Sequence, residues 1–79
     1  MQRDDGYQVK DLYLAAFLFS QGIELKDVER IGKVCWFVFV DKETCERMTT
    51  SYWSGRAMGN IKSFVDGIRS LKDIIFAKT

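Results

Sequence analysis

The residue types that most often carry out chemistry in proteins are few in this sequence, and their spacing does not bring them together. Histidine, the commonest general base and metal ligand, is absent from the 79 residues. Cys35 and Cys45 stand ten residues apart without a second pair, so they do not match the spacing of a zinc site. Gly55 and Gly59 lack the Lys-Ser/Thr that completes a phosphate-binding loop, and nothing near Thr49–Ser51 could activate a hydroxyl nucleophile. The sequence therefore predicts a protein that is not an enzyme and that uses no cofactor or metal.

The charged residues predict no general attraction to nucleic acid or to an anionic membrane. Twelve basic and eleven acidic residues leave a net charge of +1, so any such attraction must come from local clustering. Asp41, Glu43 and Glu46 are interpreted as a solvated helix start rather than as a metal cage. A loose basic set offers candidate phosphate contacts for an alternative function, a nucleic-acid-associated accessory protein that uses a basic hairpin tip: Lys26, Arg30, Lys33, Arg56 and Lys62, with Lys10. If the hairpin turn and the 56–62 link converge in space, these residues would form a modest phosphate-binding patch.

The segment Lys33–Val40 must occupy the centre of the fold, because its apolar run is too short for a typical helix and is rich in β-branched and aromatic residues. Side chains alternate along a strand, so one face carries Val34, Trp36, Val38 and Val40, and the other carries Cys35, Phe37 and Phe39. The aromatic pattern is similar to that of RNA-recognition modules but lacks their Lys/Arg-Gly-aromatic start. Both faces of this strand need to be covered.

The remaining segments predict an α+β fold of one domain over residues 1–79, with a frayed start at 1–6. We expect a helix over Leu12–Gly22 capped by Asp11, and a strand over Ile23–Ile31 with a bulge near Lys26-Asp27. That strand and the central one form an antiparallel hairpin around Gly32. Two further helices follow, from Lys42 to about Trp53 after Asp41, and from Ile61 to about Ala77 after Asn60. The predicted order is α-β-β-α-α, and a short third strand at Tyr7–Lys10 is an option.

Helical spacing predicts which side chains these helices bury. The first helix is apolar all round, which predicts that it is either central or covered by another chain, and its two alanines would allow a neighbour to approach closely. The second helix should bury Cys45, Met48, Thr49, Tyr52 and Trp53, and the third should bury Ile61, Phe64, Val65, Ile68, Leu71 and Ile75. The opposite side of the third helix carries a solvated charged stripe, Lys62, Asp66, Arg69 and Asp73. A stripe of Ser63, Gly67, Ser70, Ile74 and Ala77 either permits close helix contact or faces water.

The excess of apolar and aromatic residues predicts a protein that acts by protein–protein contact. Two short strands with apolar side chains on both faces are hard to cover with three helices, so we expect self-association, as a dimer, or contact with another protein. The alternative is one helix on each face and a complete monomer. The candidate interface residues are Trp36, Phe17, Phe37 and Trp53, because large aromatic residues anchor interfaces.

The sequence also predicts a soluble, cytoplasmic protein. The first six residues have none of the organisation of a signal peptide, and no apolar run approaches the ~20 residues that span a bilayer. Free cysteines fit a reducing compartment, and a disulfide between Cys35 and Cys45 has no support.

Several short segments resemble a family of short prokaryotic and phage proteins known only as a domain of unknown function. The resemblance extends from about Tyr7 to Phe76 and rests on these segments: Asp11-Leu12-Tyr13-Leu14-Ala15-Ala16 with Gly22, Phe37-Val38-Phe39, Tyr52-Trp53-Ser54-Gly55, Phe64 and Leu71-Lys72. It implies a compact, stand-alone domain of prokaryotic or phage origin, and it assigns no catalytic or binding residue.

Overall fold

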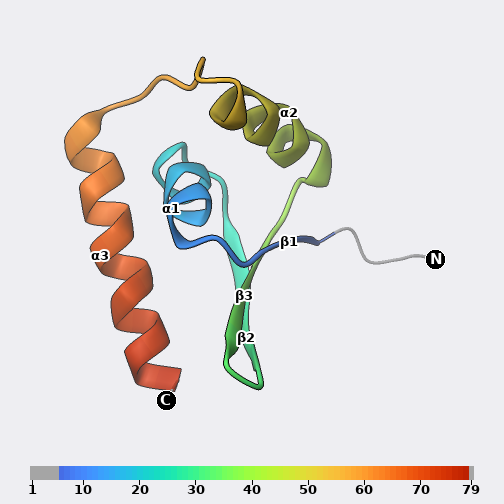
Figure 1. Cartoon of the computed structure of the whole chain (residues 1–79), viewed down its shortest axis with the longest axis vertical. Coiled ribbons are helices and arrows are strands. Elements are labelled where there is room, and N and C mark those ends of the chain that lie inside the picture. The colour runs from blue at the N-terminus through green and yellow to red at the C-terminus, as the bar shows by residue number, and fades with distance from the viewer. Residues whose placement is uncertain (1–5, 79) are drawn as a thin grey trace.

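The chain folds into a small antiparallel sheet with helices packed against one of its faces (Figure 1). The computed structural model describes residues 6–78, so of the expected frayed start at 1–6 only Gly6 lies within the described residues. The elements are β1 (Tyr7–Val9), α1 (Leu12–Ser20), β2 (Leu25–Ile31), β3 (Val34–Phe39), α2 (Lys42–Trp53) and α3 (Ile61–Lys78). This is the predicted α+β class, and the optional N-terminal strand is present, so the order is β-α-β-β-α-α.

The central strand of the sheet is β3, as the sequence predicts, with the strand order β1-β3-β2. Both neighbours run antiparallel to it, and Val9 and Val28 each lie opposite Phe37. The register of β2 shifts between Leu25 and Asp27, which confirms the predicted bulge. Because the bulge adds one residue to β2, Val28 returns to the face that the helices cover.

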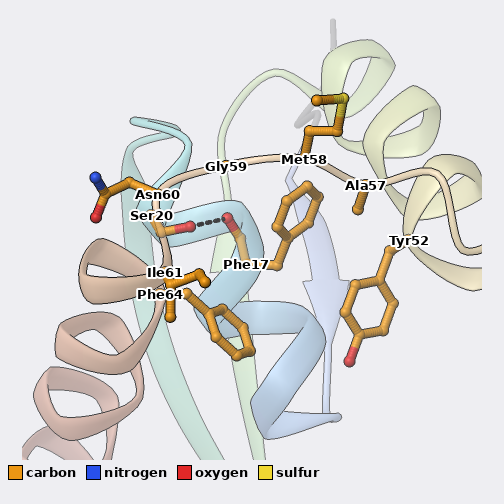
Figure 2. A pocket seen from close by; sticks show the side chains of 9 residues that line it. All are labelled: Phe17, Ser20, Tyr52, Ala57, Met58, Gly59, Asn60, Ile61 and Phe64. Atoms are coloured by element: carbon orange, nitrogen blue, oxygen red, sulfur yellow. Dashed lines mark hydrogen bonds between the residues drawn. The ribbon is translucent and has the colours of Figure 1, made fainter.

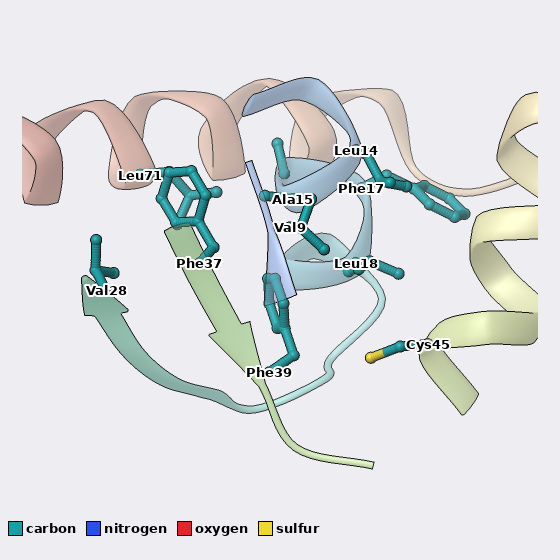
Figure 3. Close-up of a cluster of buried hydrophobic side chains, with 11 residues drawn as sticks. Val9, Leu14, Ala15, Phe17, Leu18, Val28, Phe37, Phe39, Cys45 and Leu71 are labelled. Carbon is teal, nitrogen blue, oxygen red and sulfur yellow. The ribbon is translucent and has the colours of Figure 1, made fainter. Parts of the chain in front are cut away.

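The hydrophobic core lies between this face of the sheet and the helices (Figure 3). Phe37 and Phe39 supply its largest side chains from the sheet, and α1 supplies five consecutive buried residues. Among the residues that the structure describes, the buried cluster is Val9, Leu14, Ala15, Ala16, Phe17, Leu18, Val28, Phe37, Phe39, Cys45 and Leu71. Of the two positions predicted for α1, the structure therefore shows the central one.

The second face of the sheet carries no helix within the described residues (Figures 1 and 3). Val38 is buried there by its neighbours, whereas Trp36 is half-buried and Val34 is exposed. The ammonium of Lys10 lies 6.0 Å from the centre of the Trp36 ring, close enough for a cation–π contact. One chain thus covers only one of the two apolar faces that the sequence predicts.

Each helix begins at the capping residue that the sequence predicts: Asp11, Asp41 and Asn60. The side-chain oxygen of each accepts a hydrogen bond from the backbone N–H three residues later, at 2.9, 3.2 and 2.9 Å respectively. The Thr44 hydroxyl also donates to Asp41, and these bonds hold the pKa of Asp41 below its usual range. The ionised Asp41 cap therefore stabilises the folded state at neutral pH. This stabilisation is lost as the pH falls through the lowered pKa.

Three residues that helical spacing predicts to be buried are exposed instead. Trp53 is 64% exposed and Ile61 is 80% exposed, and Val65 also faces solvent. Trp53 is the last residue of α2 and Ile61 is the first residue of α3, so both lie at helix ends. Val65 is exposed because the buried face of α3 is rotated toward Gly67 and Ile74, while the other residues predicted on that face still pack on the core: Phe64, Ile68, Leu71 and Ile75.

Helices α1 and α3 approach each other closely at Ala16 and Gly67. A Cβ atom added at Gly67 would lie 3.1 Å from the Ala16 carbonyl oxygen and 3.6 Å from the Phe19 ring. Gly67 is buried, whereas Ser63 and Ser70 of the same stripe are exposed. The predicted close approach is therefore present at Gly67, and the serines beside it face water.

We expect Gly67→Leu to lower the free energy of unfolding by about 2 kcal/mol or more, because the new side chain would push α3 away from the Ala16 backbone. Urea denaturation measures the change. The control is Ser70→Leu on the exposed side of α3, which should stay within about 0.5 kcal/mol of the wild type. Equal effects at the two positions would contradict a close contact at Gly67.

Candidate functional site

An apolar groove opens between the C-terminal end of α2 and the N-terminal end of α3, with α1 as its floor (Figure 2). Its volume is about 200 Å³. The residues that line it are Phe17, Ser20, Tyr52, Ala57, Met58, Gly59, Asn60, Ile61 and Phe64. Figure 2 shows the rings of Phe17, Tyr52 and Phe64 around this hollow, with Met58 above them.

The link between α2 and α3 closes one end of the groove. Helix α2 ends at Trp53, and Gly55, which follows the capping residue Ser54, has a φ of +79° that lets the chain turn away from the helix. The Gln21 side-chain amide then donates a 3.0 Å hydrogen bond to the Met58 carbonyl oxygen, which ties the link to the end of α1. A Cβ atom at Gly59 would lie 2.5 Å from the Nε2 atom of this amide, so a larger residue there would make the flexible Gln21 side chain shift.

Aromatic side chains give the groove its shape. The ring centres of Phe17 and Tyr52 are 5.7 Å apart, and those of Tyr52 and Trp53 are 5.0 Å apart in an edge-to-face arrangement. Burial raises the pKa of Tyr52, and the charges of Asp11 and Tyr13 raise it further. The phenol therefore stays neutral at physiological pH, and the groove wall carries no charge there.

Two polar side chains of the lining, those of Ser20 and Asn60, already make local hydrogen bonds. The Ser20 hydroxyl donates to the Phe17 carbonyl oxygen at 2.8 Å, within the same helix. The Asn60 side-chain oxygen accepts from the Ser63 backbone N–H as the cap of α3. The groove therefore offers apolar contact, with few free polar groups to orient a substrate.

The structure separates the four residues predicted to form an interface. Phe17 lies in the floor of the groove, and Trp53 lies beside its wall. Trp36 lies on the open face of the sheet. Phe37 is only 1% exposed and contacts the core, because its side of β3 faces the helices; it is a core residue rather than an interface residue.

Met58 is the residue of the groove that sequence reasoning missed. The sequence interpretation assigned no role to Met58, which is 84% exposed at the rim. A large apolar residue in a short exposed link was the available signal, because such a residue buries nothing within its own chain.

The predicted phosphate-contact residues lie at opposite ends of the molecule. Arg30 and Lys33 of the hairpin, with Lys10, line a second hollow of about 330 Å³ beside the end of α3. Arg56 and Lys62 lie in or next to the α2–α3 link, at the other end (Figure 1). The hairpin turn and the 56–62 link therefore do not converge into a single basic patch.

The two cysteines are free thiols. Cys45 is fully buried, and its thiol donates to the Val40 carbonyl oxygen at 3.5 Å. Burial raises the pKa of Cys45 to about 11, with a further contribution from Asp41, so the thiol stays protonated at neutral pH.

Within residues 6–78, no three cysteine or acidic side chains gather closely enough to hold a metal ion. No helix in the same range is long and apolar enough to cross a membrane.

Comparison with known proteins identifies the family of the chain. The searches of curated proteins and of solved structures give no match. A family model described as "Domain of unknown function (DUF5659)" matches residues 4–77, almost the whole chain. The predicted membership of a family without an assigned function is confirmed, while the prokaryotic or phage origin stays a prediction. The chain belongs to the DUF5659 family.

Proposed function

We propose that this chain is a non-enzymatic domain that acts by protein–protein contact, including contact with a second copy of itself. The observation that carries the proposal is the apolar groove with its exposed rim. Trp53, Met58 and Ile61 leave most of their apolar surface in water around the groove, at a cost that burial against a partner would remove.

The size of the groove favours side chains of another protein over a small ligand. Pockets for cofactors and drug-sized ligands enclose about 300–1,000 Å³, whereas this hollow encloses about 200 Å³. Its walls are the ends of two helices and its floor is a third, an arrangement that suits a partner segment carrying one or two large apolar side chains. The cytoplasm remains the compartment that we propose.

A dye that binds exposed apolar surface tests the groove. We expect Met58→Asp to reduce the fluorescence enhancement of anilinonaphthalene sulfonate severalfold, because the new carboxylate would repel the dye and remove its apolar contact. The matched control is Ile31→Asp, which adds the same charge at an exposed apolar residue of the hairpin, far from the groove. Equal fluorescence losses in the two variants would show that the dye does not report on the groove.

Light scattering on a sizing column tests self-association. We expect a solution mass above that of the monomer that rises with protein concentration and persists at high salt, because apolar burial is not weakened by ionic screening. Two protein concentrations and two salt concentrations are sufficient. A monomer under all four conditions would contradict self-association and leave only contact with a different protein.

A second candidate function, association with nucleic acid, is favoured by the cluster of Lys10, Arg30 and Lys33 around one hollow whose lining has no carboxylate. It predicts a gel shift of mixed-sequence DNA or RNA at low salt that weakens as salt rises. Lys33→Glu should abolish the shift, whereas Lys62→Glu at the other end of the molecule should leave it nearly unchanged. The absence of any shift at low salt would exclude this candidate.

A further inference from the structure

The outward face of α3 carries four charged residues in one stripe. Lys62, Asp66, Arg69 and Asp73 are spaced by four, three and four residues, so they follow one side of the helix. All four side chains are exposed, and α1 packs against the opposite side of α3 (Figure 1). The stripe is therefore presented to solvent along most of the helix.

The charges along this stripe have the opposite signs when the stripe is read in the reverse direction, so the stripe is complementary to an antiparallel copy of itself. The signs alternate from positive at Lys62 to negative at Asp73. When two such helices lie antiparallel about a two-fold axis between residues 67 and 68, Lys62 faces Asp73 of the partner subunit. In the same register Asp66 faces Arg69 of the partner subunit. Every positive charge in the stripe then lies opposite a negative charge.

The contacts within the chain leave these charges available. Lys62 and Asp66 form an ion pair at 3.0 Å, but both side chains are exposed, so this pair contributes little and can exchange partners. Arg69 and Asp73 have the same spacing as that pair, yet no ion pair joins either of them to another described residue.

An apolar stripe runs beside the charged one on the same helix. It consists of Ile61, Val65 and Phe76, all exposed, with Lys72 between them. In the same antiparallel pair, Ile61 lies opposite Phe76 of the partner subunit, and Val65 lies opposite the aliphatic stem of Lys72 of the partner subunit. These apolar pairs are centred one residue further along the helix than the charge pairs. The pattern is that of an antiparallel helix pair, with an apolar seam and complementary charges along its flank.

We infer that the outward face of α3 is a self-association surface, on which a second copy of the chain packs its own α3 antiparallel about a two-fold axis near residues 67 and 68. This inference rests on the proposed self-association and names the surface that performs it. An isologous contact of this kind uses the same stripe twice, which only a self-complementary charge order permits. A helix of 18 residues is about 27 Å long, so the interface is small and the dimer depends on concentration.

The sheet offers weaker grounds for self-pairing. Its outer strand β2 carries the bulge and exposed charges such as Asp27 and Glu29, features that oppose strand pairing with another chain. The opposite outer strand, β1, has only three residues. The open face around Trp36 shows no pattern that is complementary to itself.

Charge exchange at Asp66 and Arg69 tests the inference. Asp66→Arg alone places two arginines opposite each other, and Arg69→Glu alone places two carboxylates opposite each other. We expect each variant by itself to dimerise about ten-fold or more weakly than the wild type, because two symmetry-related pairs become repulsive. A 1:1 mixture of the two variants should regain near wild-type association, since each arginine at 66 then faces a glutamate at 69. Sedimentation velocity at several protein concentrations measures the dissociation constants.

Matched controls separate the surface from charge effects in general. Glu46→Arg and Arg47→Glu change the same charges on exposed residues of α2 and should associate like the wild type. Circular dichroism checks that each variant folds. If Asp66→Arg or Arg69→Glu does not fold, the variants Lys62→Glu and Asp73→Lys, alone and mixed, test the same charge exchange at the second predicted contact.

The outcomes distinguish this inference from the proposal that it rests on. Single variants that associate like the wild type, or a mixture no tighter than its components, would overturn the α3 surface and leave self-association through another face. A wild-type chain that is monomeric at every concentration would overturn self-association itself. Loss in the single variants with recovery in the mixture supports the antiparallel register.

Discussion

The close packing of α3 on α1 at Gly67 and Ala16 is the contact on which the rest of the structure depends. Helix α1 has only nine residues and is apolar on nearly every side, so it must be enclosed. Because neither Gly67 nor Ala16 has a side chain beyond Cβ, the backbones of the two helices approach closely. This contact also fixes the rotation of α3, and with it the face that α3 presents to solvent.

The apolar groove lies where the start of α3 and the α2–α3 link meet the end of α1. Gly67, which contacts Ala16, is near the start of α3, and the Gln21 side chain holds the Met58 carbonyl oxygen, so the link passes over the end of α1. Apolar residues placed there, such as Met58 and Ile61, find no neighbour to cover them. The exposed apolar surface and the hollow beside Phe17 thus have one geometrical origin, and they lie together on one side of the molecule.

The distribution of charge separates the possible contacts. The hairpin hollow beside Arg30 and Lys33 is basic, the groove wall at Tyr52 is neutral, and the outward face of α3 alternates in sign. A net charge of only +1 conceals these local differences. Each surface therefore matches a different one of the contacts proposed above: with nucleic acid, with apolar side chains of another protein, and with a second copy of the same helix.

The sequence by itself determined the features that depend on neighbours a few residues away. The caps at Asp11 and Asn60, the bulge before Val28 and the alternation of β3 were all predicted, because the hydrogen bonds and sterics involved are local. Only the tertiary structure decided that Trp53 is exposed and that Phe37 lies in the core rather than at an interface. Those outcomes depend on how the helices pack and on which face of the sheet they cover, and such long-range packing leaves no signal in residue spacing.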